Sequence, residues 1–222
     1  MRKITINLAA VAAFCIVVAS PALVSSSCAT PKTEQEDTTI IREDSGITAL
    51  KYSSPEVPTS IEFCGKTIDL SRFDRHERMD RELLAFTYMH STSLQMLKKA
   101  NRYFPIVEPI LKENGIPDDF KYLMVIESNM NPTARSSAGA AGLWQFMQGT
   151  GRDYGLEVNN NVDERYHIEK ATRAACRYLK DAYAKYKDWV AVAASYNAGQ
   201  ARIASQLAKQ DVDDSLDLQL EI

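Results

Sequence analysis

The chain has 222 residues and a formal net charge of −3 at pH 7, which is enough length for one domain with a hydrophobic core. The slightly acidic balance excludes the basic footprint of a nucleic-acid-binding protein. No glycine-rich phosphate loop follows a predicted strand, and no Gly-x-Ser-x-Gly motif occurs. His76, His90 and His167 have no second ligand at helical spacing, so we expect neither a cofactor nor a metal ion.

The first 29 residues have the composition of an export signal. Arg2 and Lys3 are followed by an apolar run from Leu8 to Ala19. That run is too short to span a bilayer comfortably, but it suits the core of a secretory signal. We therefore expect residues 1–29 to be a signal segment and the chain to be exported.

Cys28 raises the question of a lipid anchor. It follows Ser25-Ser26-Ser27, and small residues before a cysteine resemble the lipobox of bacterial lipoproteins. Ser25 stands where that motif prefers Leu or Val, so the alternative is ordinary cleavage, with Ser20-Pro21-Ala22 or Ser27-Cys28-Ala29 as the small-residue site. An unmodified surface thiol is unusual in an exported chain, which favours lipidation of Cys28. The protein would then lie in the periplasm, anchored to the outer membrane.

Residues 30–60 are rich in Thr, Ser, Glu, Asp and Pro and poor in apolar residues, which is typical of a flexible tether. The stretch from Ile61 to Leu70 alternates around Cys64-Gly65 and predicts a small hairpin. Cys64 and Cys176 are the cysteines left for the domain, and two thiols do not define a disulfide framework.

From Asp74 onward the pattern is almost entirely helical. The stretch from Arg75 to Ala100 places five apolar residues on one stripe: Met79, Leu83, Phe86, Leu94 and Leu97. A second helix around Ile106 to Leu111 ends at Asn114-Gly115, a left-handed stop. Residues 61–114 are therefore predicted to be a helical extension that begins with the hairpin.

The next predicted helix begins at Pro117, with Asp118 and Asp119 at its positively polarised end. Asn131-Pro132 is expected to close it. The stretch from Leu123 to Ile126 is apolar throughout, so this helix should be buried on nearly every side.

Glu127 lies on the same helical face as Phe120, Leu123 and Met124. A carboxylate in such a place costs several kcal/mol, or its pKa rises until the group keeps a proton. Chains seldom keep such a residue without a use for it, so Glu127 is the leading candidate for chemistry.

Further helices complete a mainly α domain predicted over residues 115–210. Small residues line one face of the stretch from Glu169 to Tyr186, which allows close helix–helix packing. That face contains Ala171, Ala174, Ala175, Tyr178, Leu179, Ala182 and Tyr186. A short apolar helix after Asp188 ends at Gly199, where a glycine cap is expected.

Two polar–aromatic patches accompany Glu127: one from Ser136 to Gly151, the other from Ala194 to Gly199. In the first patch, Gly142 precedes Leu143, Trp144 and Gln145, which combines bare backbone, an indole and an amide. An amide with an aromatic surface suits an N-acetylated sugar, which presents hydroxyls, an amide and apolar ring faces. Taken alone, each patch is more often turn and cap chemistry.

Four segments in order carry a resemblance to a known family: "IESN", "AGAAGLWQFM", "NVDERYHIEKATRAACRYL" and "AASYNAG". Together they resemble the transglycosylase SLT domain, in particular the membrane-bound lytic murein transglycosylases of the D type. The resemblance covers residues 115–210 and implies a lysozyme-like helical fold. It also implies that the partner is the glycan strand of peptidoglycan, cut between N-acetylmuramic acid and N-acetylglucosamine.

By the same resemblance, Glu127 is the single acid/base of the reaction. It would protonate the glycosidic oxygen and then take the proton of the muramic acid 6-hydroxyl, which leaves a 1,6-anhydro end. Substrate-binding positions implied by the motifs are Ser128, Gly142, Gln145, Tyr196 and Asn197. Ser128 and Asn197 also have a plainer interpretation, as a polar residue at a helix end and as a cap.

Two alternatives stay open. A hydrolase like the goose-type lysozymes would need a second carboxylate, for which Asp153 and Glu157 are the candidates, since Asp118 and Asp119 lie too far along the helix from Glu127. The other alternative is an inactive peptidoglycan-binding protein. It rests on the tail 211–222, which stops where the family continues into a further helix, so we expect a shortened family member with weak or no activity.

Overall fold

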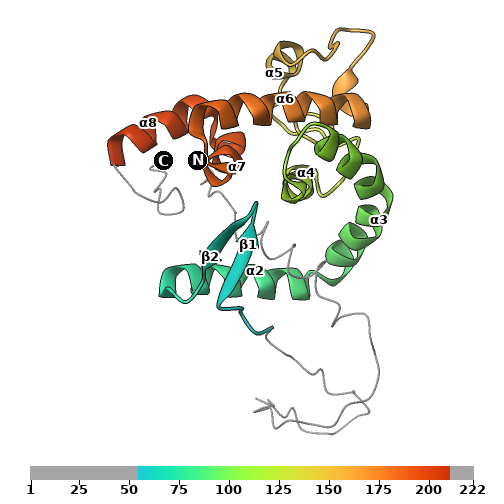
Figure 1. Ribbon diagram of the computed structural model, residues 1–222. Helices are drawn as coiled ribbons and strands as arrows, with labels where there is room; N and C mark the ends of the chain where they lie inside the picture. Colours follow the sequence, from blue (N-terminus) through green and yellow to red (C-terminus); the bar gives the residue numbers. More distant parts are fainter. Residues whose placement is uncertain (1–54, 211–222) are drawn as a thin grey trace, which may run out of the picture.

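The computed structural model of the chain describes residues 55–210 (Figure 1). The predicted signal segment, Cys28, most of the predicted tether and the tail 211–222 lie outside the described residues. Within the described part, no helix combines the length and the apolar character that a membrane span requires. The prediction of a mainly helical domain preceded by a small hairpin is confirmed.

The hairpin consists of β1 (Ser60–Phe63) and β2 (Lys66–Asp69), paired antiparallel with Phe63 opposite Lys66. Its two turn residues, Cys64 and Gly65, both have positive φ angles, 52° and 78°. Such a turn matches the twist of the strands it joins. The Cys64 backbone N–H donates a hydrogen bond of 2.6 Å to Asp119 Oδ2, so the hairpin tip is fixed to the helical domain.

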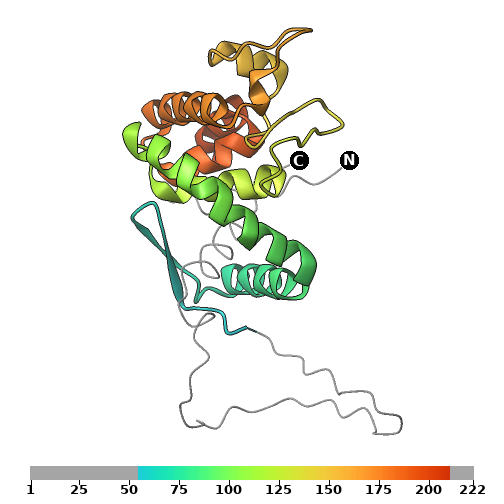
Figure 2. The same cartoon turned by 90° about the vertical axis from the view of Figure 1, so that its right-hand side faces the viewer.

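The predicted stripe from Met79 to Leu97 is wrong as a single helix. The chain breaks at Met89, between α2 (Phe73–Tyr88) and α3 (His90–Glu113), which run in different directions in Figures 1 and 2. The helical phase restarts at the break, so Leu94 is 55% exposed while Met96 is buried. The predicted helix at 106–111 is the last part of α3, with Pro105 and Pro109 inside it.

The segment that carries Glu127 is the 3₁₀ turn η2 (Asp118–Phe120) followed by α4 (Lys121–Ser128). Its expected end at Asn131-Pro132 is wrong, because α4 already ends at Asn129, which has the left-handed conformation. Lys121 fixes α4 to α3, since its Nζ donates a hydrogen bond of 2.7 Å to Glu108 Oε1 and also bonds to Asp118.

The C-terminal half is built around α6 (Ile168–Tyr186), with α7 (Trp189–Ala198) and α8 (Gln200–Gln210) after it. The predicted small-residue face is confirmed, because Ala171, Ala174, Ala175, Leu179 and Ala182 are all buried. This face packs against α3 and α7. Figure 1 shows α4 and α7 on one side of α6 and α5 (Gln148–Asp153) on the other; the 3₁₀ turn η3 (Glu164–Tyr166) precedes α6.

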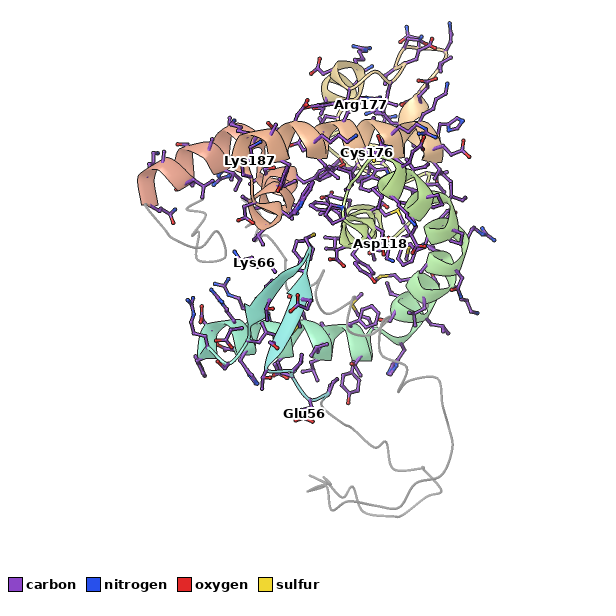
Figure 3. The ribbon with its side chains drawn as sticks, viewed as in Figure 1. Glu56, Lys66, Asp118, Cys176, Arg177 and Lys187 are labelled. Carbon is purple, nitrogen blue, oxygen red and sulfur yellow. The ribbon has the colours of Figure 1, made fainter. Side chains whose placement is uncertain are left out.

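The two cysteines of the described region are both free thiols and lie apart. Cys64 is at the hairpin turn, whereas Cys176 is fully buried on α6 beside α3 (Figure 3). Burial raises the pKa of the Cys176 thiol to about 11. Cys176 therefore behaves as a small apolar core residue.

Candidate active site

Glu127 lies in the last turn of α4, next to a helix face that is otherwise buried and apolar. Its own side chain is half-buried, and among residues 55–210 no group donates a hydrogen bond to its carboxyl. Burial raises the pKa of Glu127 from 4.5 to about 7. The rise expected from the sequence is therefore found, and near neutral pH a large fraction of this carboxyl keeps its proton.

The backbone turns sharply after Glu127 and Ser128. Asn129 and Met130 both have positive φ angles, 50° and 52°. Asn tolerates this conformation, but Met does so rarely, and Met130 is fully buried. Lys99, from α3, donates a hydrogen bond of 3.0 Å to the Asn129 carbonyl. This turn sends the chain out of α4 into the loop of residues 131–147.

Gly142 lies where this loop approaches the backbone of Arg165 closely. It has a φ of 78°, and a Cβ atom placed there would be 1.9 Å from the Arg165 carbonyl oxygen. Only glycine fits such a contact. The backbone of Gly142 thus lies against the chain's own backbone at Arg165, and its role in substrate binding stays a prediction.

Gln145 is half-buried and has a φ of 49°. Its Nε2 donates hydrogen bonds to the carbonyls of Gly142, at 2.8 Å, and Ala134, at 3.3 Å. Both partners are acceptors, so the orientation of the amide is fixed by chemistry. Both amide hydrogens are used within the loop, which leaves Oε1, an acceptor, as the atom Gln145 can offer to a ligand.

The expectation that Trp144 provides an aromatic surface is wrong. Trp144 is 0% exposed, and its Nε1 donates a hydrogen bond of 2.9 Å to Thr172 Oγ1 on α6. A large apolar ring with one satisfied donor is more stable in the core than at the surface. Trp144 therefore anchors the loop to α6.

Tyr196, on α7, connects the loop with Glu127. Its hydroxyl donates a hydrogen bond of 2.7 Å to the Trp144 carbonyl. Its ring lies 6.2 Å from that of Phe146 and 5.2 Å from that of Tyr178. Burial, and then the charge of Glu127, raise the pKa of Tyr196 well above its usual value. The structure thus places Tyr196 near Glu127 and binds it to the loop at the residue before Gln145.

The two remaining predicted positions differ in their surroundings. The Ser128 hydroxyl is buried and donates a hydrogen bond of 2.9 Å to the Met124 carbonyl, which agrees with its plainer interpretation as a helix-end residue. Asn197 is half-buried in the last turn of α7, and within the described region no hydrogen bond to its side chain occurs. The role of Asn197 in substrate binding therefore stays a prediction.

The candidate second carboxylates are not placed beside Glu127. Asp153 ends α5, on the opposite side of α6 from α4 (Figure 1), and Glu157 is exposed beyond it. Asp118 bonds to Lys121, and Asp119 binds the hairpin. No charged group contributes to the pKa rise of Glu127. The described residues also contain no cluster of three or more His, Cys, Asp or Glu side chains that could hold a metal ion.

Arg165 was not predicted as a site residue, although the sequence pairs it with Asp163 just before α6. It is 5% exposed, and its side chain forms a two-point contact with Asp163, at 2.9 and 2.7 Å. Its Nη1 donates to the carbonyls of Gly139, at 2.8 Å, and Phe146, at 3.0 Å. The only sequence signal for this contact is an Asp-x-Arg before an alanine-rich helix.

The described domain is mainly helical and carries one glutamate whose pKa burial raises to about 7. The profile of the transglycosylase SLT domain family matches residues 105–217. The match extends over half of the chain. The protein belongs to the transglycosylase SLT domain family.

Two relatives are similar to this chain over part of its length. The membrane-bound lytic murein transglycosylase D of Escherichia coli K12 is 31% identical over 128 residues, 57% of this chain and 27% of the relative. The peptidoglycan transglycosylase gp16 of Escherichia phage T7 is 33% identical over 95 residues, 41% of this chain and 7% of the relative. The chain therefore spans only 27% of the E. coli relative and 7% of the phage relative.

Glu127→Gln should stabilise the fold in a pH-dependent way. The folded-state pKa is raised from 4.5 to about 7, so the stability linked to the neutral carboxyl is complete below pH 4.5 and is lost as the pH rises through 7. The variant should gain up to roughly 3 kcal/mol over the wild type above pH 7 and nothing below pH 4.5. Urea unfolding at several pH values measures this difference, with Glu77→Gln as the control for losing an exposed carboxylate. A gain that does not change with pH would contradict it.

Proposed function

We propose that this chain is a lytic transglycosylase that cleaves peptidoglycan between N-acetylmuramic acid and N-acetylglucosamine and leaves 1,6-anhydromuramic acid ends. The observation that carries this proposal is Glu127, a carboxyl with a pKa of about 7 and no second carboxylate acting on it among residues 55–210. Family membership supports the same reaction class. The catalytic unit would be residues 115–210.

Glu127 would act first as general acid. A carboxyl that keeps its proton near neutral pH can donate it to the glycosidic oxygen as the bond from the anomeric carbon to that oxygen breaks. The leaving sugar departs with a new hydroxyl, and positive charge develops on the muramic acid ring. The Glu127 carboxylate formed in this step lies next to that charge.

Glu127 would then act as general base. It takes the proton of the muramic acid 6-hydroxyl while that oxygen bonds to the anomeric carbon, so Glu127 ends protonated again. No water enters, and the attacking group belongs to the substrate itself. Ordinary glycosidases use a second carboxylate to activate water or to form a covalent intermediate, and intramolecular attack removes that need.

Substrate binding would depend on Gln145 and Asn197, whose free polar atoms were described above. Gly142 and Tyr196 would act by keeping the loop in place, since both contact the chain's own carbonyls. Ser128 would close the end of α4 next to Glu127. The ligand is the peptidoglycan glycan strand, and the mechanism uses no cofactor.

The products of digestion test the reaction class. Muropeptides released from purified peptidoglycan should carry 1,6-anhydro ends and weigh one water less than the products of hydrolysis, as measured by mass spectrometry. Glu127→Gln should release them at least ~100-fold more slowly, because an amide cannot donate the proton. Reducing ends throughout the digest would favour a hydrolase and direct attention to Asp153 and Glu157. A folded wild type that binds peptidoglycan without cutting it would favour the inactive binding protein.

The pH dependence of kcat/KM tests the role of Glu127 separately. The acid must be protonated in the free enzyme, so kcat/KM should fall about tenfold per pH unit above the pKa of about 7. Between about pH 5 and 7 the profile should be flat, since the reaction has no second carboxylate that must be ionised. A bell-shaped profile with its acidic limb in that range would show a second essential group.

We also propose that the protein is exported to the periplasm and anchored to the outer membrane through a lipid on Cys28. The charged start and short apolar run of the sequence support export. Cys28→Ala should move the protein from the membrane fraction to the periplasmic fraction, because the substitution removes the thiol that would carry the lipid. Equal distribution of both variants would exclude lipidation as the means of attachment.

A further inference from the structure

The buried guanidinium of Arg165 is the most completely engaged ion in the described part of the chain outside the proposed chemistry. Asp163 accepts from its Nε at 2.9 Å and from Nη2 at 2.7 Å. The Gly139 and Phe146 carbonyls accept from Nη1 at 2.8 and 3.0 Å. Asp163 also accepts from the Arg165 backbone N–H at 3.2 Å, which fixes η3 as a unit. A buried charge with this many partners is rigidly held.

These contacts enclose the part of the loop that carries Gln145. Gly139 precedes Gln145 and Phe146 follows it, and both are bound by the same nitrogen. Between them, the backbone of Gly142 lies against the Arg165 carbonyl oxygen, where a Cβ would be 1.9 Å away. One residue therefore sets the position of the loop before, within and after the turn that presents Gln145.

The conformation of Gln145 is unfavourable by itself and depends on contacts that hold the loop. Its φ of 49° is unfavourable for a residue with a long side chain. Its two amide hydrogens bind the Gly142 and Ala134 carbonyls only while the loop keeps its shape. In that state Gln145 offers an acceptor, so it selects a donor on the ligand, such as the N–H of an acetamido group or a sugar hydroxyl.

We propose that Arg165 is a positioning residue for substrate binding, which acts by holding Gln145 with its Oε1 available to a donor on the glycan strand. This proposal rests on the proposed function. Lysine cannot replace arginine in this role, because an ammonium lacks the planar fork that reaches two carboxylate oxygens and two carbonyls at once. Arg165 touches neither the reacting atoms nor the substrate.

A double-mutant cycle on soluble, uncrosslinked glycan strands tests the proposal. Gln145→Ala should raise KM about 3- to 10-fold, the effect of one lost hydrogen bond, with kcat nearly unchanged. Arg165→Lys should raise KM by a similar factor, and the double variant should show no further rise, since both changes remove the same contact. The pH profile of kcat/KM should stay that of the wild type. Arg173→Lys is the matched control, because that arginine is exposed on α6 and pairs with Glu113 alone, and its KM should not change.

Each other outcome has a defined meaning. If the KM effects of Arg165→Lys and Gln145→Ala multiply, or if Arg165→Lys lowers only the Tm, Arg165 is a structural residue and the proposal is wrong. If Arg165→Lys does not fold, Asp163→Asn replaces it, because it keeps the arginine and weakens one side of its contacts. The same rise in KM, non-additive with Gln145→Ala, is then expected.

A wild type that neither cleaves nor binds glycan strands would overturn the proposed function and this proposal together. An active wild type with an unchanged KM in the variants would overturn this proposal alone.

Discussion

The close packing of α6 against α3 and α7 is the interaction on which the site depends. The alanines on the buried face of α6 let both neighbouring helices approach closely, and Thr172 on the same helix binds the indole of Trp144. The loop that carries Gln145 is anchored through Trp144, and Tyr196 on α7 binds the carbonyl of that residue. A larger residue on this face would push α7 away from α6 and move Tyr196 away from Glu127.

This packing also determines the chemistry available to Glu127. Its pKa rises because apolar neighbours remove water from the carboxyl, and no charge or hydrogen bond opposes that effect. The same desolvation costs stability whenever the group ionises. With a fully solvated carboxyl at this position the fold would be more stable at neutral pH, but the group would carry no proton to donate. The raised pKa that suits Glu127 to act as an acid therefore lowers the stability of the fold, and the packing of the surrounding helices offsets that loss.

Local patterns in the sequence predicted the elements whose cause is local. The alternation around Cys64-Gly65 predicted the hairpin, the alanine spacing predicted the buried face of α6, and the apolar run predicted the raised pKa of Glu127. Features set by distant contacts were missed. Periodicity alone does not show a change of axis at Met89, and Trp144 could be judged exposed or buried only with Thr172 in view. The role of Arg165 depends on carbonyls 19 and 26 residues away.

The backbone itself explains why these distant contacts are concentrated at the site. Non-glycine residues with positive φ occur at Cys64, Asn129, Met130, Gln145 and Lys187 among residues 55–210. The hairpin turn explains Cys64, and helix ends explain Asn129 and Lys187. Met130 and Gln145 have no such local reason, and each costs on the order of 1–3 kcal/mol. Met130 lies three residues after Glu127, and Gln145 itself carries the amide acceptor. The packing of Met130 and the hydrogen bonds of Gln145 to loop carbonyls must offset this cost. The Glu127 carboxyl and the Gln145 amide, which are proposed to face the substrate, are therefore held in place before it binds.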